Sequence, residues 1–478
     1  MSTDAALASP PFQARLRSHR LFDPVDIASL ACFRIAFGAI MLWEVIRYFQ
    51  NGWIASYFIA PKFHFHYFGF EWINPWPGQG MYVHFAALGV LAVGVMIGCF
   101  YRVCATLMAI GFTYVFLLER ANYLNHFYLI CLICFIMACL PAHRAMSVDA
   151  WRKRRIRSQT TPTWTLWLLR FQIALPYFFG GIAKLNADWL AGEPLQTWLF
   201  DDRQSAFGPF SAHAAALGLS WGGMLFDLLI VPMLLWRRSR PLALVLALAF
   251  NVTNAHLFQI GIFPWFMIAG TLMFLSPSWP RVVWRRVLRH SAMVTPSHEL
   301  SHGAAHSAEL PARHRLGRQA ITAALALYVF IQLALPLRHF LYPGPVSWTE
   351  EGHLYSWHMK LRDKSGEVNF IAWSPVSGKT WVVDHRQYLT PRQVRKMPAR
   401  PDMIHEFARF LGRELESQGH SPVRIGVQSL VSLNGRPPQP LIDPRVDLSR
   451  EPVTLGAKRW ILPLDPAAFE QVRTAEAE

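Results

Sequence analysis

The chain has 478 residues, of which 53% are hydrophobic, and it contains 19 Trp and 34 Phe at a formal net charge of +16. This composition is typical of a membrane protein and excludes an ordinary soluble domain and a disordered chain. The positive charges gather in connections between apolar runs, which argues against a protein that binds nucleic acid.

The N-terminal segment, residues 1–22, is polar and carries Arg15, Arg17 and Arg20 without an apolar core. A cleavable signal peptide needs such a core, so none is predicted. We expect a cytoplasmic tail followed by a first span that is retained.

Apolar runs dominate residues 23–289. A helix needs about 20 apolar residues to cross the hydrocarbon core, and the chain offers eight candidate runs in this region and a ninth after it. The predicted fold is therefore a polytopic α-helical membrane protein with about nine transmembrane helices. The predicted spans are residues 27–49, 81–99, 103–119, 125–141, 163–185, 218–236, 240–257, 259–275 and 319–338.

Basic residues are concentrated in alternate connections, at residues 144–157, 237–240 and 281–289. By the positive-inside rule these connections and the N-terminus are cytoplasmic. Residues 290–318 are polar without apolar periodicity, and we expect a poorly ordered cytoplasmic linker there. An odd number of spans then places residues 339–478 outside the cytoplasm.

The outer region, residues 339–478, predicts an extracytoplasmic α+β domain rich in short β-strands. A turn is expected at Pro375 and Gly378. The apolar spacing of residues 403–415 predicts one helix. Short runs of strand-forming residues predict strands at residues 353–360, 368–373, 379–383, 423–432 and 459–463.

Lys184 ends the apolar run of residues 163–185. Removing water from a lysine lowers its pKa, and an amine that is neutral near pH 7 can abstract a proton. Lys184 is therefore a candidate base. The alternative is that its side chain snorkels from a helix end to the lipid headgroups.

Other polar residues are expected at the same depth as Lys184. Asn125 and His126 begin the fourth predicted span, and Asn254 and His256 end the seventh. Polar residues inside a membrane are candidates for function by default. Helix capping and packing hydrogen bonds between helices are the alternatives.

Two residue pairs have the spacing of metal ligands. Cys131 and Cys134 lie in an apolar run without a second pair of ligands, and His64 and His66 lie in a loop without a neighbouring carboxylate or thiol. No metal is predicted, and all six thiols of the chain are expected to be buried, without a disulfide framework. The aromatic loop itself, residues 53–80, is either an interfacial belt or the wall of a slot for a flat apolar ring.

The outer domain carries a basic stretch that includes Arg392, Arg395 and Lys396. It is either a solvated face or a docking site for an acidic peptide. The sequence contains no phosphate-binding glycine loop, dinucleotide fingerprint or nucleophile elbow, which disfavours nucleotide hydrolysis, dehydrogenation and serine hydrolysis.

Five segments are informative through their order and spacing. They are Asn-His at 125–126, Gly-Ile-Ala-Lys-Leu-Asn-Ala-Asp-Trp at 181–189, Asn-x-x-Asn at 251–254 with Phe-Gln-Ile-Gly-Ile-Phe-Pro at 258–264, Leu-Tyr-Ser-Trp at 354–357 and Asp-Pro-Arg-Val-Asp at 443–447. Together they resemble the vitamin K-dependent gamma-glutamyl carboxylases and their bacterial relatives of the HTTM domain family, over residues 22–464. Ala183 and Asn186 stand where the animal enzymes have a second lysine and an aspartate.

The resemblance implies a lyase that forms a carbon–carbon bond. In that family an embedded lysine deprotonates reduced vitamin K, a phylloquinone or menaquinone hydroquinone, which reacts with oxygen to give a strong alkoxide base and ends as the epoxide. The alkoxide removes a glutamate γ-proton, and the carbanion adds carbon dioxide. The implied cofactor is this hydroquinone, with oxygen and carbon dioxide as co-substrates.

The resemblance also implies roles for individual residues. It gives Lys184 the role of the base, with Asn125 and His126 in the supporting polar site. The residues expected at the cofactor are Tyr355, Trp357, Asn254 and His256. The residues expected at the peptide substrate are Arg392, Arg395, Lys396 and His358.

The implied partners are the lipid bilayer and a glutamate-containing peptide or protein, without nucleic acid. The implied location is a bacterial inner membrane, with the N-terminus cytoplasmic and the C-terminal domain periplasmic. Two alternatives stay open: a quinone epoxidase or oxidoreductase that does not carboxylate, and a non-enzymatic membrane receptor that binds an acidic partner through its outer domain.

Overall fold

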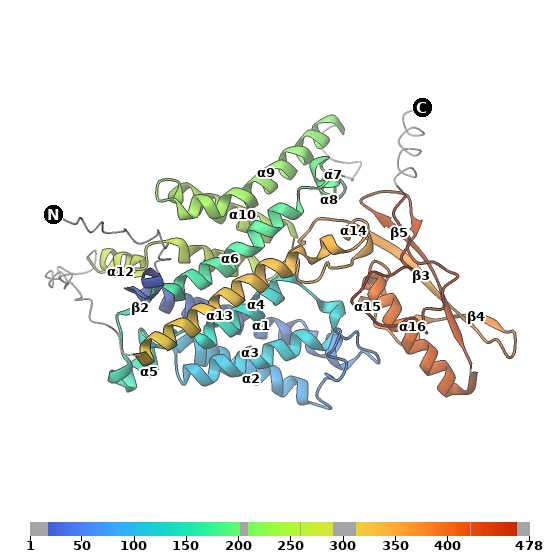
Figure 1. Ribbon diagram of the computed structural model, residues 1–478, viewed down its shortest axis with the longest axis horizontal. Coiled ribbons are helices and arrows are strands. Elements are labelled where there is room, and N and C mark those ends of the chain that lie inside the picture. The colour runs from blue at the N-terminus through green and yellow to red at the C-terminus, as the bar shows by residue number, and fades with distance from the viewer. Residues whose placement is uncertain (1–17, 201–208, 259, 290–311, 421, 466–478) are drawn as a thin grey trace, which may run out of the picture.

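A computed structural model describes residues 18–200, 209–258, 260–289, 312–420 and 422–465. Apolar helices form an elongated bundle, and an α+β domain lies at one end of it (Figure 1). Within these residues seven helices are long and apolar enough to cross a membrane. They are α1 (Ala28–Gln50), α2 (Gly80–Ile97), α3 (Tyr101–Leu118), α6 (Thr163–Ala183), α9 (Pro209–Leu235), α10 (Arg240–Phe258) and α13 (Ala312–Leu337).

Two further apolar helices are shorter than a span. They are α4 (Asn125–Cys139) and α11 (Phe263–Thr271), which continues into the 3-10 turn Leu272–Phe274. The 15 residues of α4 lie between an extended Leu124 and an extended Leu140, which precedes Pro141, and the residue before a proline is kept out of helical geometry. The predicted count of nine spans is therefore not confirmed; seven are found in the described chain.

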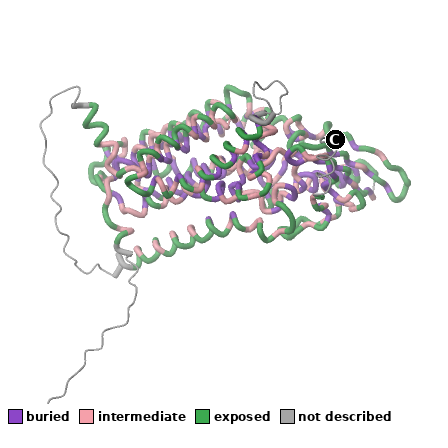
Figure 2. The backbone as a smooth tube through the Cα atoms, turned by 90° about the horizontal axis from the view of Figure 1, so that it is seen from above, coloured by how far each residue is buried: buried purple, intermediate pink, exposed green. Residues whose placement is uncertain are grey.

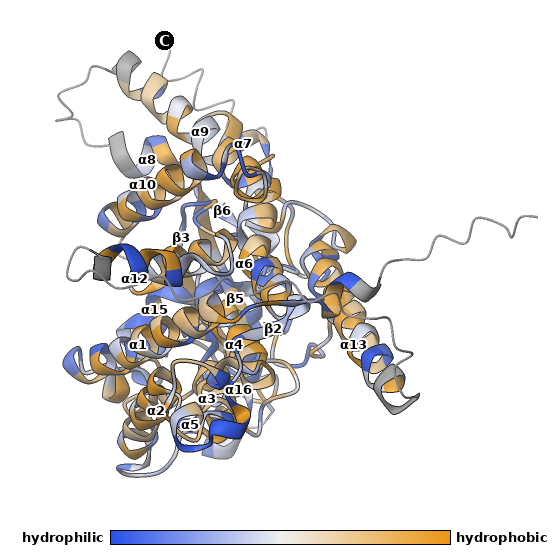
Figure 3. Cartoon of the chain, turned by 90° about the vertical axis from the view of Figure 1, so that its left-hand side faces the viewer, coloured by the Kyte–Doolittle hydropathy of each residue, from blue (hydrophilic) through white to orange (hydrophobic). Residues whose placement is uncertain are grey.

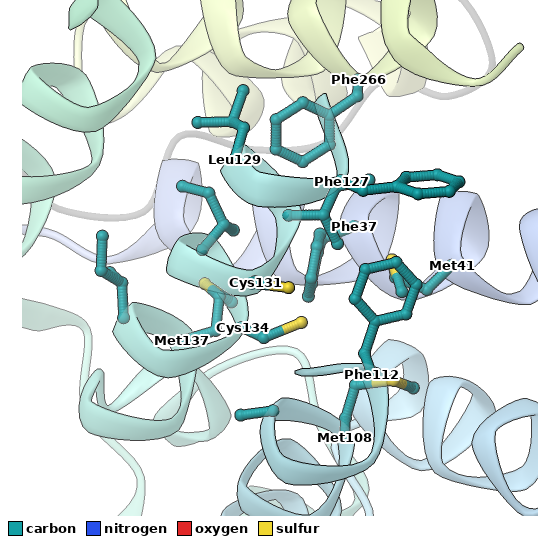
Figure 4. Packing of buried hydrophobic residues seen from close by; sticks show 14 of the residues in the cluster. Phe37, Met41, Met108, Phe112, Phe127, Leu129, Cys131, Cys134, Met137 and Phe266 are labelled. Carbon is teal, nitrogen blue, oxygen red and sulfur yellow. The ribbon is translucent and has the colours of Figure 1, made fainter. Parts of the chain in front are cut away.

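The centre of the bundle is a dry, aromatic core. Cys131 and Cys134 on α4 lie among Phe37, Phe112 and Phe127 (Figure 4). Both cysteines are free and buried, as predicted. The prediction is wrong for Cys139, which is exposed, and Cys32, Cys99 and Cys104 are only partly buried.

Charged connections lie at the end of the bundle opposite the α+β domain. The short helices α5 (Val148–Arg152) and α12 (Trp279–Arg289) are found there (Figure 1), and hydrophilic residues colour both of them in the view from that end (Figure 3). The strands β1 (Pro24–Asp26) and β2 (Thr160–Pro162) pair antiparallel. This arrangement agrees with the alternate basic loops, while the sidedness of the membrane stays a prediction.

The last span, α13, begins earlier than expected. Residues 312–318 are helical, so the predicted linker 290–318 is wrong over its final part, where alanine, arginine and leucine favour helix; residues 290–311 lie outside the described chain. Most of α13 is exposed, and Figure 2 shows the buried segments gathered in the bundle and in the outer domain instead. Polar contacts tie it to the bundle: the Tyr328 hydroxyl donates to Oε1 of Gln172 at 2.5 Å, and Gln332 hydrogen-bonds Tyr128 of α4.

The outer domain is a four-stranded antiparallel sheet in the order β4-β3-β5-β6 with helices packed against it. The inward residues of β3 and β5 alternate with outward ones, and Phe370 pairs with Val427 across them. The elements are α14 (Val346–Thr349), β3 (Lys364–Trp373), β4 (Thr380–Val383), α15 (Pro391–Lys396), α16 (Pro401–Leu415), β5 (Arg424–Leu433) and β6 (Gln439–Pro440).

Three strands and the helix of the outer domain are confirmed, as is the turn between β3 and β4. Residues 353–360 are not a strand, because Tyr355, Trp357 and Lys360 have φ values of 64°, 60° and 51°, which no pleated strand accommodates. Residues 459–463 contribute only an isolated bridge between Ile461 and Ile442.

The outer domain is held on the bundle by ion pairs. Arg120, in the 3-10 turn Arg120–Asn122 after α3, contacts Asp402 and Glu406 of α16 at 2.7 Å each. His66 contributes a 3.2 Å contact between Nδ1 and Oε1 of Glu406. At the other side of the interface, Arg436 binds Asp188 at 2.6 Å.

Candidate active site between α6, α9 and the outer domain

The outer end of α6 is set by a helix cap. Asn186 is extended (φ −133°, ψ 158°), and its side chain accepts a hydrogen bond from the backbone N–H of Trp189 at 3.0 Å, which starts the short helix α7 (Ala187–Leu190). Because the chain leaves helical geometry there, α6 ends at Ala183 and Lys184 is its C-cap residue.

Two glycines of α6 let α9 come close to this lysine. A Cβ atom on Gly181 would lie 2.7 Å from the Leu228 side chain, and one on Gly180 would lie 3.3 Å from Oδ2 of Asp227. Any larger residue at Gly181 would therefore push the two helices apart. The Gly-Gly step in front of Lys184 thus permits Asp227 to reach it.

Lys184 and Asp227 form an ion pair in which Nζ donates a hydrogen bond to Oδ2. Their side chains are 9% and 7% exposed. The ring of Trp189 lies 5.1 Å from Nζ, and its Nε1 donates to the carbonyl of Ser220 at 2.8 Å. The lysine is thus buried, as the sequence predicts, but its amine is paired, because α9 supplies a carboxylate.

Asp227 is a candidate site residue that the motifs do not reveal. The signal for it is present, since it is the single charged residue in the apolar run 218–236. Ionisable residues inside spans are rare and usually paired. Its partner could not be chosen from the sequence, because the contact joins residues on different helices.

A cavity of ≈ 590 Å³ lies between α6, α9 and α10, with Lys184 and Asp227 in its wall. The wall is mostly apolar. At its polar side, Nδ2 of Asn251 donates to the Tyr177 hydroxyl at 3.2 Å, and Asn254 follows one helical turn later. Aromatic side chains that line it are Tyr177, Trp189, Trp198, Phe226, Phe250, Phe258 and Phe263.

A second cavity of ≈ 300 Å³ adjoins the first, and both are lined by Phe258, Ile260 and Lys360. His126 lines this outer cavity, with its ring stacked on Phe263 at 5.5 Å. His126 and Lys184 therefore belong to neighbouring cavities rather than to one polar site.

Residues 350–360 form a strap that closes the bundle from the outer side. Asn125 holds it, since its Nδ2 donates to the carbonyl of His358 at 3.0 Å. The Tyr123 hydroxyl donates to Oδ1 of Asn125 at 2.9 Å and accepts from the Tyr355 backbone N–H at 2.7 Å. Asn125 is thus a positioning residue and lines neither cavity.

The aromatic residues of the strap face α4 rather than the lysine. Trp357 is buried, with its ring 5.1 Å from that of Tyr128, and Tyr355 lies 4.8 Å from the same ring. Met359 and Lys360, the next strap residues that reach the larger cavity, were not among the predicted site residues. Positive φ values at Tyr355, Trp357 and Lys360 turn some side chains of the strap toward α4 and others toward the larger cavity.

Other predicted residues lie apart from the lysine. His256 is exposed and lines neither cavity, because the helical turn after Asn254 directs it away. The strap residue His358 is buried, and burial, with help from His339 and Arg362, lowers its pKa to about 3. Both therefore stand outside the site as the structure forms it.

The basic stretch of α15 is divided between two environments. Arg392 lines the outer cavity, where its Nε donates to Oδ1 of Asn122 at 2.7 Å and its guanidinium lies 4.4 Å from the Tyr57 ring. Arg395 and Lys396 are exposed on the surface of the domain. Only Arg392 can therefore take part in the cavities directly.

Two known protein families match the chain. The HTTM domain matches residues 22–279, which is more than half of the chain, and the lumenal domain of vitamin K-dependent gamma-carboxylase matches residues 317–467. The chain belongs to the gamma-carboxylase family. No solved structure matches it.

The two matched domains of the gamma-carboxylase family both contribute residues to the two cavities. The HTTM match covers the helices that carry Lys184, Asp227 and His126, and the lumenal-domain match covers the strap with Lys360 and the helix with Arg392. Each cavity is therefore lined by residues of both matched domains. The family indicates a carboxylase-like membrane enzyme.

Proposed function

We propose that the protein is a membrane gamma-glutamyl carboxylase that couples carboxylation to epoxidation of a reduced vitamin K-type hydroquinone, with Lys184 as the base on the hydroquinone. The observation that supports this proposal is the buried Lys184–Asp227 pair in the wall of a large apolar cavity. A paired amine in such a place is costly for the fold, and such groups concentrate at functional sites.

The larger cavity fits the proposed cofactor. Its ≈ 590 Å³ falls within the range of about 300–1,000 Å³ that is usual for ligand sites. The rings of Tyr177, Phe226 and Phe263 offer apolar walls to a naphthoquinone head, and Asn254 and Lys184 offer hydrogen bonds to its oxygens. With oxygen, the bound hydroquinone supplies a base far stronger than any side chain.

Lys184 and Asp227 act as a unit in this proposal. The hydrogen bond from Nζ of Lys184 to Oδ2 of Asp227 gives the two groups a path along which a proton taken from the ligand can be shared. Asp227 also holds the amine in place, so that little reorganisation is needed when the proton moves.

Exclusion of water is the second task of the protein. The ring of Trp189 on α7 lies 5.1 Å from the amine, and Met359 of the strap lines the cavity from the side of the outer domain. A strong base and a carbanion would both be quenched by water, so a closed apolar cavity is required for the reaction.

The peptide substrate is assigned to the outer face. A glutamate-containing peptide or protein would approach past Arg392, with Arg395 and Lys396 as the exposed part of the same basic surface. Carbon dioxide and oxygen are small and apolar enough to enter through the bilayer. This direction of approach fits a bacterial inner-membrane enzyme whose outer domain is periplasmic.

The experiment that tests the function uses purified, detergent-solubilised protein. Epoxide formation from chemically reduced vitamin K is measured by chromatography for the wild type, for Lys184→Met and for Lys379→Met, a control at an exposed lysine of the outer domain. Incorporation of labelled carbon dioxide into a glutamate-containing peptide is followed in parallel. We expect epoxide and labelled peptide from the wild type and the control, and neither from Lys184→Met.

Other results would replace the proposal. Epoxide without labelled peptide would favour an oxidoreductase that does not carboxylate. Wild-type epoxide formation by Lys184→Met would overturn the role of this lysine. No epoxide from a folded wild type with fully reduced cofactor would favour a receptor for an acidic partner.

A further inference from the structure

The outer cavity contains more positive charge than its own acidic groups neutralise. Arg47 of α1 is paired with Glu44 at 2.5 Å, so these two charges cancel. Arg392 contacts only the neutral Asn122 and the Tyr57 ring. Lys360 contacts the rings of Trp198 and Phe258 at 5.2 and 5.1 Å. Within the described chain, neither Arg392 nor Lys360 has a carboxylate within ion-pair distance.

Lys360 is an exposed residue with an unfavourable backbone conformation. Its backbone is left-handed, with φ 51°, a conformation that is strained for a residue with a Cβ atom. Such strain persists when the surrounding structure needs the side chain in one direction. Here that direction places Lys360 in the lining of both cavities.

The aromatic contacts of Lys360 place its ammonium beside two rings without neutralising its charge. Ring faces attract a cation weakly, so the ammonium keeps most of its capacity to bind an anion. The outer cavity is also small, at ≈ 300 Å³, which suits one side chain of a peptide rather than a cofactor.

From these observations we propose that the outer cavity is a carboxylate-binding site in which Lys360 and Arg392 bind the side-chain carboxylate of a glutamate residue, with Lys360 as the residue that sets specificity. The assignment to glutamate rests on the function proposed above, whereas carboxylate binding itself rests on the unpaired charges. Since Lys360 lines both cavities, a glutamate held there has its γ-carbon at the passage toward Lys184.

Binding, rather than turnover, tests this site. The probe is N-acetyl-glutamate amide, with N-acetyl-glutamine amide as its neutral counterpart, titrated into protein in zwitterionic lipid nanodiscs and followed by calorimetry. The variants are Lys360→Met, which keeps the length of the stem, and Lys360→Asn, which suits left-handed backbone. The control is Lys379→Met at an exposed lysine.

We expect the wild type and Lys379→Met to bind the glutamate probe and to discriminate against the glutamine probe. Both Lys360 variants should bind the glutamate probe at least about tenfold more weakly, as expected for loss of a charge-assisted hydrogen bond. Their melting temperatures should stay near that of the wild type, which would show that the loss is local.

The site is overturned if either Lys360 variant binds the glutamate probe as tightly as the wild type, or if the wild type binds the glutamine probe equally well. Lys184→Met separates this site from the proposed function, because it should still bind the glutamate probe while forming no epoxide. Probe binding that survives in a protein without any epoxide formation would leave the carboxylate site standing and remove the proposed function alone.

Discussion

The amine of Lys184 on α6 donates a hydrogen bond to the carboxylate of Asp227 on α9, and both side chains are almost fully shielded from water. Two charges buried together need each other, because removal of one leaves the other without a partner in an apolar cavity. The pair therefore couples the packing of two membrane helices to the chemistry of the site.

This coupling can be measured with a double-mutant cycle. Lys184→Met and Asp227→Asn should each lower the free energy of unfolding by about 3–5 kcal/mol, and the double variant should lose much less than the sum of the two. Thermal unfolding in detergent gives the comparison. Strictly additive losses would show that the two side chains do not interact.

The close approach of α6 and α9 predicts a steric effect at Gly181. Gly181→Ala places a methyl group 2.7 Å from the Leu228 side chain and 3.1 Å from its backbone nitrogen, so the helices must separate. We expect a loss of about 1–3 kcal/mol in stability together with reduced epoxide formation. Gly317→Ala on α13, where a Cβ would meet nothing within 4 Å, should be neutral or slightly stabilising. Equal effects of the two substitutions would contradict this.

The outer domain should come loose when Arg120 is removed. Arg120→Ala leaves Asp402 and Glu406 of α16 without their 2.7 Å partner, and we expect a loss of about 3–5 kcal/mol. Arg445→Ala breaks an exposed pair with Asp443 and should cost less than about 1 kcal/mol. Limited proteolysis should cut the outer domain of Arg120→Ala first. Unchanged protease resistance would argue that the ion pairs of Arg120 do not hold the outer domain on the bundle.

Acid should destabilise the strap through His358. Burial lowers the pKa of His358 to about 3 in the folded protein, whereas a histidine of the unfolded chain titrates near ~6.5. Between these two pKa values only the unfolded chain binds the proton. The free energy of unfolding is therefore fully present above pH ~6.5 and falls as the pH falls toward the pKa of the folded protein. The loss is about 1.4 kcal/mol at pH ~5.5.

Melting temperatures between pH 7.5 and 5.5 check this expectation. His358→Gln should reduce the pH dependence without removing it, because burial also lowers the pKa of His353. His420→Gln, at an exposed histidine, should leave it unchanged. A wild type whose melting temperature rises on acidification would contradict the sign.

Sequence patterns predicted the parts of the fold that depend on neighbours along the chain. The apolar run 27–49 became α1 (Ala28–Gln50), and the three-and-four spacing of residues 403–415 became α16. In both cases one helix face or one membrane-length run carries the signal, so no distant contact is needed to read it. The short α4 is the limit of this approach, since Pro141 ends it before it reaches the length of a span.

The strap shows why local patterns fail elsewhere. Residues 353–360 have the composition of a strand, but Tyr355 and Trp357 pack on Tyr128 of α4 at positive φ. Tertiary contacts overrode the local preference there. The Asn125 side chain, a plausible functional group from its position, instead fixes this strap through the carbonyl of His358.

Only part of the candidate site could be predicted from the sequence, for the same reason. Lys184 could be identified from its place at the end of an apolar run, but Asp227 is brought to it only by the packing of α9 on Gly180 and Gly181. His126 was expected beside the lysine and lies in the neighbouring cavity, while Lys360 was not expected at all.

Under the proposed function, the two adjoining cavities receive their reactants from different phases, the bilayer and the water. The larger one is walled by helices that cross the bilayer, and the smaller one is walled by charged side chains beneath the outer domain. Under the proposed function, the concentration of the hydroquinone that enters the larger cavity is expressed per lipid. The concentration of the peptide that enters the smaller cavity is expressed per volume of water. Diluting a vesicle suspension would therefore change the supply of one reactant and leave the other untouched, and each needs its own concentration scale.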